Sequence, residues 1–378
     1  MVHIEVDDRG FIYRNPLPQL RSRQAYYPTI VSLNSGELLA SFQVGEASES
    51  VDGHNEIARS SDGGRSWNLE PCIWDGTKDL PPHSYSLRLS RTVNGVLLCY
   101  GGRWNRSDPN LPIANPDTSG MLSNELVFFM SPDQGHTWKG PTVVRPSIPG
   151  PFEIGRGIIP LSSGRWLAPF STWKDWNGRN ISGPKAIVAC SSDGGSTWPE
   201  LYEVAAHPDR LMGYWEQRII ELEDDHLLAV FWVHDYERDE DLPNHYALSE
   251  DGGRTWSEPR STGMWGQTNS PLWLGNGKLL CVYNYRYGAP GVRAALVSFD
   301  RDHWTVETEK VIWGVNNIEA DSAASVRRRK DVSLAEEFAS FQFGLPSAIP
   351  LPSREYLAVY WCVEQCVARI RWNRLRIT

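Results

Sequence analysis

An eight-residue motif, S-x-D-x-G-x-x-W, occurs four times along the chain and constrains the fold more than any other feature. The copies are SSDGGRSW (60–67), SPDQGHTW (131–138), SSDGGSTW (191–198) and SEDGGRTW (249–256), with a shorter variant that lacks the glycine, SFDRDHW (298–304). An aspartate that accepts backbone N–H groups and a glycine with positive φ are typical of a tight hairpin turn, and the tryptophan can pack between sheets. We therefore interpret these aspartates as structural turn residues rather than as metal ligands or catalytic groups.

A second repeat, independent of the octets, consists of an apolar strand, a turn and another apolar strand. Its six copies span 29–42, 87–100, 157–170, 218–231, 270–283 and 346–360. In the first five units an octet follows the strand pair, so each unit predicts one four-stranded antiparallel sheet. Such a sheet cannot bury both faces alone, but six sheets packed radially cover one another. We therefore predict an all-β fold, a six-bladed β-propeller of four-stranded antiparallel sheets.

This propeller is expected to span residues 1–378 as a single domain. The first strand, HIEV, and the last strand, ARIRWNRLRI (368–377), are expected to share the sixth blade and close the ring. An insertion at 314–340 separates blades five and six. It contains a basic run, VRRRK (326–330), which we interpret as a solvated loop, and the pattern of one short helix, DVSLAEEFASF (331–341).

The charge and the motif content exclude several function classes. The chain carries 37 basic and 46 acidic residues, a net charge of −9, which argues against nucleic acid or an anionic membrane as a partner. No run of about 18 apolar residues predicts a transmembrane helix. The segment MVHIEVDDRGFIYRN lacks the basic and apolar regions of a secretion signal, so we expect a cytoplasmic location. The six cysteines are scattered, and no nucleotide-binding or metal-binding motif occurs, so we expect no cofactor and no metal.

The octets and the six strand pairs together resemble the Asp-box, or BNR, repeats of the sialidase superfamily, over the full length of the chain. Members include exo-sialidases, other glycosidases, polysaccharide lyases and non-catalytic binders, so the resemblance specifies the fold better than the activity. It implies a pocket on the propeller axis, lined where innermost strands begin and second strands end. The residues at strand starts include Arg21, Arg23, Tyr26, Tyr27, His83, Tyr85, Glu153, Arg156, Trp215, Glu216, Arg218 and Gln267, and those at second-strand ends include Gln43, Arg103, Trp173, His234, Tyr285, Arg286, Tyr287 and Trp361.

The family's own motifs match this chain only in part. Sialidases carry a Tyr-Arg-Ile-Pro motif before the first strand pair, and the matching segment AYYPTIVSL (25–33) has Tyr26 in place of the arginine. The resemblance implies Glu216, in GYWEQRIIEL, as the catalytic glutamate. It implies Asp52, in SVDGHNEIARSSDGG, as the acid/base aspartate, with His54 and Glu56 close by as alternatives.

The family's nucleophilic tyrosine would lie near the start of the sixth strand pair, where Pro346 or Ser347 stands instead. The sequence therefore predicts a divergent member rather than an orthodox sialidase. The fifth blade, NYRYGAPGVRAALVS, resembles the arginine-bearing segment of many Asp-box enzymes and suggests Arg286 and Arg293 as an anion-binding pair. Our candidate catalytic residues are Glu216, Asp52, Tyr285 and His83, and our candidate substrate-binding residues are Arg218, Arg286, Arg293, Arg103, Tyr26, Trp215 and Gln267.

Three functional hypotheses follow, all with a carbohydrate as the partner and none specifying the oligomeric state. The first is an exo-acting glycoside hydrolase on a non-reducing terminal sugar, acidic sugars included, with Glu216 as base or nucleophile and Asp52 as general acid. The second is a polysaccharide or glycuronide lyase, in which His83, His234 or Tyr85 would take a proton. The third is a propeller that binds sugar without catalysis, which the missing arginine and tyrosine favour.

Overall fold

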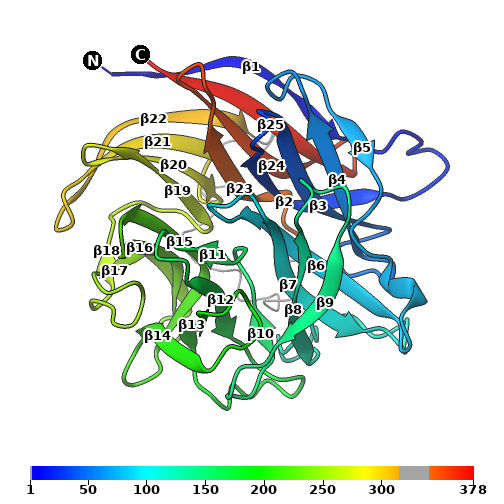
Figure 1. Ribbon diagram of the computed structural model, residues 1–378. Helices are drawn as coiled ribbons and strands as arrows, with labels where there is room; N and C mark the ends of the chain where they lie inside the picture. The colour runs from blue at the N-terminus through cyan, green and yellow to red at the C-terminus, as the bar shows by residue number, and fades with distance from the viewer. Residues whose placement is uncertain (1, 315–339) are drawn as a thin grey trace.

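Six antiparallel sheets stand around a central axis in the computed structural model of the chain, which describes residues 2–314 and 340–378 (Figure 1). The prediction of an all-β, six-bladed propeller is confirmed. Within the described ranges, the one helical element is a single 3₁₀ turn, Gly76–Lys78. No helix in this part of the chain is long and apolar enough to cross a bilayer.

The strands follow one another from the axis outward in each blade. Blades one to three comprise β2 (Gln24–Ser32), β3 (Leu38–Gly45), β4 (His54–Ser60) and β5 (Asn68–Glu70); β6 (His83–Arg91), β7 (Leu97–Asn105), β8 (Asn124–Ser131) and β9 (Lys139–Val144); and β10 (Phe152–Glu153) with β11 (Ile159–Pro160), β12 (Trp166–Thr172), β13 (Lys185–Ser191) and β14 (Glu200–Ala206). Blades four to six comprise β15 (Met212–Glu223), β16 (His226–Asp235), β17 (Glu240–Ser249) and β18 (Arg260–Ser261); β19 (Asn269–Gly275), β20 (Lys278–Tyr285), β21 (Gly291–Phe299) and β22 (Trp304–Gly314); and β23 (Phe343–Pro350), β24 (Glu355–Glu364), β25 (Val367–Ile377) and β1 (Ile4–Tyr13).

The two ends of the chain close the ring, as predicted. β1 pairs antiparallel with β25, from Ile4 opposite Ile377 to Tyr13 opposite Ile370. The N-terminal strand is therefore the outer strand of the sixth blade, and both termini lie at the rim in Figure 1. Arg374 of β25 also donates a hydrogen bond to the carbonyl oxygen of Gly63, which lies in the first octet of blade one.

Among the described residues, six clusters of buried apolar side chains lie one between each pair of neighbouring blades, and a seventh, small cluster contains Trp215 and Trp232. Leu38 and Phe42 of blade one, for example, share a cluster with Leu357 and Trp361 of blade six. Burial of large apolar side chains contributes about 1.5–3 kcal/mol each, relative to exposure. Because each cluster needs both of its blades, the blades stabilise one another and the axis is held in a fixed geometry.

The octets form the turns between third and fourth strands, far from the axis, as the structural interpretation of their aspartates requires. In the octet 191–198, the carboxylate of Asp193 accepts hydrogen bonds from the Thr197 N–H at 2.9 Å and the Thr197 hydroxyl at 2.7 Å. Ser191 Oγ accepts from the Gly195 N–H at 2.9 Å. Trp198 Nε1 donates to the Gly195 carbonyl oxygen at 3.2 Å, and the indole packs against the cluster between blades two and three.

The insertion expected at 314–340 falls almost entirely on residues 315–339, which lie outside the described residues. The interpretation of 326–330 as a solvated loop and the short helix at 331–341 therefore stay predictions.

The octets predict a specific loss of stability in acid. Hydrogen bonds from the Thr197 hydroxyl, the Thr197 N–H and the Ser191 hydroxyl lower the pKa of Asp193 to about 2. A lowered carboxyl pKa contributes stability that is present above the unfolded-state pKa, about 4, and is lost as the pH falls through the folded-state value. We expect the thermal unfolding midpoint of Asp193→Asn to fall less steeply than that of the wild type across this window.

The matched control is Asp209→Asn, which changes an exposed aspartate outside the octets. It should keep the wild-type slope. A slope for Asp193→Asn that equals the wild-type slope would contradict the assigned role of the octet carboxylate.

Candidate active site on the propeller axis

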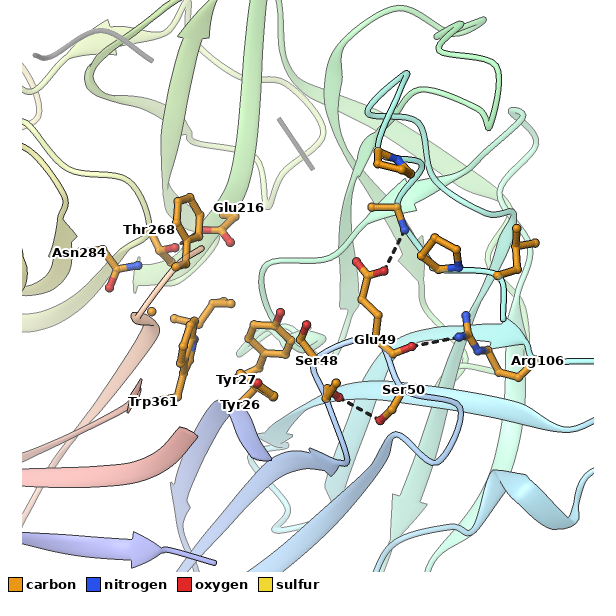
Figure 2. Close-up of a pocket in the computed structure, with 18 of the residues that line it drawn as sticks. Tyr26, Tyr27, Ser48, Glu49, Ser50, Arg106, Glu216, Thr268, Asn284 and Trp361 are labelled. Atoms are coloured by element: carbon orange, nitrogen blue, oxygen red, sulfur yellow. Dashed lines mark hydrogen bonds between the residues drawn. The ribbon is translucent and has the colours of Figure 1, made fainter. Parts of the chain in front are cut away.

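A cavity with two adjoining lobes occupies the axis. The larger lobe has a volume of about 600 Å³ and the smaller lobe about 230 Å³. Both lobes share the wall residues Tyr27, Ser48, Glu49, Ala114, Glu216, Trp232 and Leu345. Figure 2 shows the larger lobe, with Glu216, Thr268 and Trp361 on one side and Glu49 and Arg106 on the other.

Three innermost strands carry a bulge that turns one residue toward the axis. The register of pairing shifts between Tyr26 and Thr29 in β2, between Trp215 and Arg218 in β15, and between Gly344 and Ser347 in β23. Within these bulges, the residues with left-handed backbone are Tyr27 (φ 57°), Glu216 (φ 48°) and Leu345 (φ 42°). A bulge re-aims side chains and is common beside active sites. All three of these residues line both lobes.

Glu216 lies against a second carboxylate, Glu153, which belongs to the short strand β10 of the neighbouring blade. The N–H of Glu216 donates a hydrogen bond of 3.1 Å to Glu153 Oε2. The approach requires a glycine at position 155, because a Cβ there would lie 2.6 Å from the Cα of Glu216. Both carboxylates line the smaller lobe, so two acidic groups from adjacent blades face the same cavity.

Burial and mutual repulsion change the acidity of this pair. Burial, and after it the nearby charge of Glu216, raise the pKa of Glu153 to about 7, although the Glu216 N–H, Arg88 and Arg218 oppose that increase. Burial also raises the pKa of Glu216, although Arg218, Arg286 and Arg88 oppose that increase. Like-charged carboxylates that cannot both ionise share a proton and titrate as a pair. The pKa values of both carboxylates are therefore raised, and Glu153 is partly protonated near neutral pH.

Two neighbours fix the position of Glu216 and of the arginine that faces it. Thr268 Oγ1 donates a hydrogen bond to Glu216 Oε2, as Figure 2 shows. Arg286 lines the larger lobe, and its guanidinium donates to Gln267 Oε1 and to the Phe343 carbonyl oxygen. Gln267 thus lies behind Arg286 and positions it, since Gln267 itself lines neither lobe.

Aromatic side chains form much of the remaining wall. The rings of Tyr26 and Trp361 meet edge to face at 5.1 Å in the larger lobe. In the smaller lobe, Trp215 packs against Trp173 at 5.1 Å and against Trp232 at 5.0 Å. Such aromatic faces suit the apolar side of a ligand. An apolar wall with a few oriented polar groups is the usual composition of a binding cavity for a small molecule.

The loop 106–121, which connects β7 to β8, closes one side of both lobes. Glu49 Oε2 accepts hydrogen bonds from the N–H groups of Ile113 at 2.8 Å and Ala114 at 3.1 Å. On the other flank, Trp173 Nε1 donates to the Ser119 carbonyl oxygen at 2.9 Å. The loop is therefore attached to blade one and to blade three, and it narrows the cavity to a pocket.

The structure brings five of the predicted site residues to the cavity or to its immediate support. Glu216, Tyr26, Trp215 and Arg286 line it, and Gln267 holds Arg286. Arg218 is buried close to Glu216 but lines neither lobe.

Five other predicted residues line neither lobe, because each has a partner elsewhere. Asp52 Oδ1 accepts a hydrogen bond from the Glu46 N–H at 3.0 Å, within its own loop. Arg103 forms an ion pair of 2.7 Å with Glu125 on the adjacent strand. Asp52, the predicted acid/base residue, thus lies outside the cavity wall that contains Glu216.

The remaining three residues have contacts outside the cavity. Arg293 pairs with Glu309 at 2.7 Å and stacks on the ring of Tyr285, with its guanidinium carbon 3.5 Å from the ring centroid. His83 Nδ1 is 3.4 Å from Asp79. Arg293, Tyr285 and His83 therefore lie outside the cavity wall.

Glu153, Glu49 and Thr268 are the functional candidates that no motif identified. Glu153 satisfies the positional rule for the start of an innermost strand, but nothing distinguishes it there from a dozen other residues. Among the described residues, no group of three or more His, Cys, Asp or Glu side chains is arranged to hold a metal ion.

Solved structures with the same fold come from several kinds of protein. A protein of unknown function from Dyadobacter fermentans is 21% identical, with a TM-score of 0.74 over 99% of each chain. An α-L-arabinanase of Penicillium chrysogenum, solved with arabinobiose, is 16% identical, with a TM-score of 0.65 over 98% of each chain. The NanB sialidase of Streptococcus pneumoniae is 12% identical, with a TM-score of 0.64 over 97% of this chain and 70% of that one. At these identities the likeness establishes the fold alone.

A search of curated proteins finds no match to this sequence. The model of the BNR repeat-like domain, in contrast, matches residues 111–336, which is more than half of the chain. The protein therefore belongs to the family of BNR repeat-like domains, as a divergent propeller of sialidase-like fold.

Proposed function

We propose that the protein is a glycoside hydrolase that removes a non-reducing terminal sugar bound in the axial cavity. The observation that carries the proposal is the half-buried pair Glu153 and Glu216, two carboxylates from adjacent blades at the wall of one pocket, with the pKa of Glu153 raised to about 7. Hydrolysis of a glycosidic bond requires such a pair, one group acting as acid while the other acts on the anomeric carbon or activates a water.

The environments of the two carboxylates assign their roles. Glu153, with a pKa of about 7, is the protonated acid and donates its proton to the leaving oxygen as the glycosidic C–O bond breaks. Glu216 is the ionised partner, because Arg218, Arg286 and Arg88 favour its charge. Water supplies the hydroxyl group that ends on the anomeric carbon. Glu153 thus takes the acid role that the sequence suggested for Asp52.

The rest of the wall supports recognition of a sugar at a chain end. Tyr26, Trp361 and Trp232 offer aromatic faces to the C–H surface of a ring. The loop 106–121 closes one side of both lobes, which favours a substrate that enters by its end. Arg286 at the larger lobe keeps acidic sugars among the candidates. The fold relatives, which include an arabinanase and a sialidase, suggest arabinosides and sialosides for the first substrate panel.

A lyase has less support from the cavity. His83 and His234 line neither lobe. Tyr85 lines the smaller lobe, but its hydroxyl donates to Asp79 at 2.7 Å, and burial raises its pKa well above the usual value. A tyrosine that keeps its proton is a poor base. Elimination would still be recognised in the assay below by an unsaturated product.

The test is turnover of a panel of aryl glycosides by the wild type, Glu216→Gln and Glu153→Gln. We expect each variant to lose about 10²- to 10⁴-fold in kcat, the usual contribution of an acid or base. Glu153→Gln should lose much less with a dinitrophenyl leaving group, which departs without a proton. Glu203→Gln, which alters an outer-strand ion pair with Lys185, is the control. Sugar binding without any product would replace hydrolysis by the binding hypothesis, and full activity of Glu216→Gln would remove the proposed mechanism.

The raised pKa of Glu153 predicts a pH profile. The acid must be protonated, so kcat/KM should decline above about pH 7 as Glu153 loses its proton. The decline should be weak for the dinitrophenyl substrate and absent in Glu153→Gln, measured with that same substrate. A decline of unchanged position in Glu153→Gln would assign the proton to another group.

The loop predicts a separable effect on substrate binding. Glu49→Ala leaves the N–H groups of Ile113 and Ala114 without their acceptor. Hydrogen bonds to a charged group are worth about 1.5–3 kcal/mol each, so a rise in KM of about tenfold or more is expected if the loop positions the sugar. Hydrogen exchange within 106–121 should accelerate in the same variant. Glu49→Gln keeps an acceptor oxygen and should remain close to the wild type, whereas unchanged exchange and KM in Glu49→Ala would contradict the role of the loop.

A further inference from the structure

Three arginines of consecutive blades lie near the carboxylate pair, because the glycines on either side of Arg156 pack against the backbones of Glu216 and Arg88, and Arg218 follows Glu216 on the same strand. Arg88 belongs to β6, Arg156 lies between β10 and β11, and Arg218 belongs to β15. Arg88 is 5% exposed and Arg218 is 2% exposed. The positive charges of Arg156 and Arg88 both act on Arg218, whose pKa is lowered first by burial and then by these neighbours, to about 9. All three remain cationic at neutral pH.

No carboxylate within the described part of the chain forms an ion pair with any of the three. Arg88 donates to Ser86 Oγ at 3.0 Å and to the Leu87 carbonyl oxygen at 3.2 Å, and its guanidinium lies over the ring of Tyr27. The Nε atoms of Arg88 and Arg218 are buried without a hydrogen-bond partner. The cluster thus contains unsatisfied donors, and its arginines form no direct ion pair among the described residues.

The charges at the axis do not balance. Arg88, Arg156 and Arg218 contribute three positive charges near Glu153 and Glu216, and two ionised carboxylates would balance only two of them. The local sum is therefore positive. A buried charge without a counter-charge is costly, because it has lost its hydration and gained nothing in return. An anion at this place would offset the excess and accept from the free donors.

The position of the cluster indicates the size of that anion. Of the three arginines only Arg88 lines a lobe of the cavity, so a sugar carboxylate in the pocket would meet one guanidinium and not three. Arg156 nevertheless keeps partial solvent access. We propose that Arg88, Arg156 and Arg218 form a binding site for a small inorganic monovalent anion of the size of chloride, beside the catalytic carboxylates and separate from the sugar site.

Thermal unfolding of the full chain tests the proposal without any assay of hydrolysis. Sodium chloride replaces sodium gluconate at constant ionic strength, since gluconate is too bulky for the site. An anion that binds only the folded state raises the unfolding midpoint in a saturable way. We expect chloride and bromide to do so and acetate and glucuronate to have no effect. Stabilisation by the two carboxylates instead of the halides would assign the site to a substrate, and the absence of any saturable effect would overturn the proposal.

Variants locate the effect. Arg156→Gln should lose the response to chloride. In chloride-free buffer it should unfold at least as late as the wild type, because the substitution removes repulsion with Arg218. The matched control is Arg260→Gln, on the outer strand β18, which pairs with Asp302 and should respond to chloride as the wild type does. A full chloride response in Arg156→Gln would contradict the site.

Crystals soaked in sodium bromide give an independent measurement. The anomalous signal of bromide is expected among the three guanidinium groups. Bromide found only at the molecular surface would overturn the proposal even if chloride stabilised the protein. Neither result depends on whether the cavity hydrolyses a sugar, so the anion site and the proposed function can fail separately.

Discussion

Each blade of the propeller has two apolar faces, and only a neighbouring blade can cover each of them. This constraint accounts for the six inter-blade clusters and for the pairing of β1 with β25, without which the sixth sheet would lack its outer strand. It also creates the site. Six innermost strands are locked between two interfaces each, so the polar side chains at their inner ends meet at one axis, although Glu153 and Glu216 are 63 residues apart in the chain.

The fold could be predicted from the sequence because its signals are local and repeated. An octet such as 191–198 contains the whole chemistry of its turn, the carboxylate, the hydroxyl, the glycine and the tryptophan, within eight residues. The number of repeated strand pairs gives the number of blades directly. Glu216 could also be predicted, because the segment around it, GYWEQRIIEL, resembles that of the family's catalytic glutamate. The sequence shows less clearly which side chain at the start of a strand points to the axis, because register and bulges decide that orientation.

Register and bulges explain why some predicted residues lie outside the cavity wall and why no motif identified Glu153. Arg103 occupies a strand end as expected, but Glu125 stands directly opposite on β8 and neutralises it within the blade. The bulge in β2 gives the left-handed position to Tyr27, the neighbour of the residue that the motif indicated. Glu153 belongs to an innermost strand that breaks into two short pieces, β10 and β11, so no continuous strand pattern placed it beside Glu216.

The charges near the axis give the two carboxylates different electrostatic environments. Glu216 accepts a hydrogen bond from the Thr268 hydroxyl and is affected by Arg218, Arg286 and Arg88, all of which favour its ionised form. For Glu153, burial and the charge of Glu216 favour protonation, whereas the N–H donated by Glu216 and the charges of Arg88 and Arg218 oppose it. Arg286 distinguishes the two carboxylates, because its charge acts on Glu216. Arg88, Arg156 and Arg218 outnumber the two carboxylates near them. An anion bound among Arg88, Arg156 and Arg218 would only partly reduce the electrostatic stabilisation of ionised Glu216. Arg286, which lines the larger lobe, lies outside that cluster and would still favour the charge.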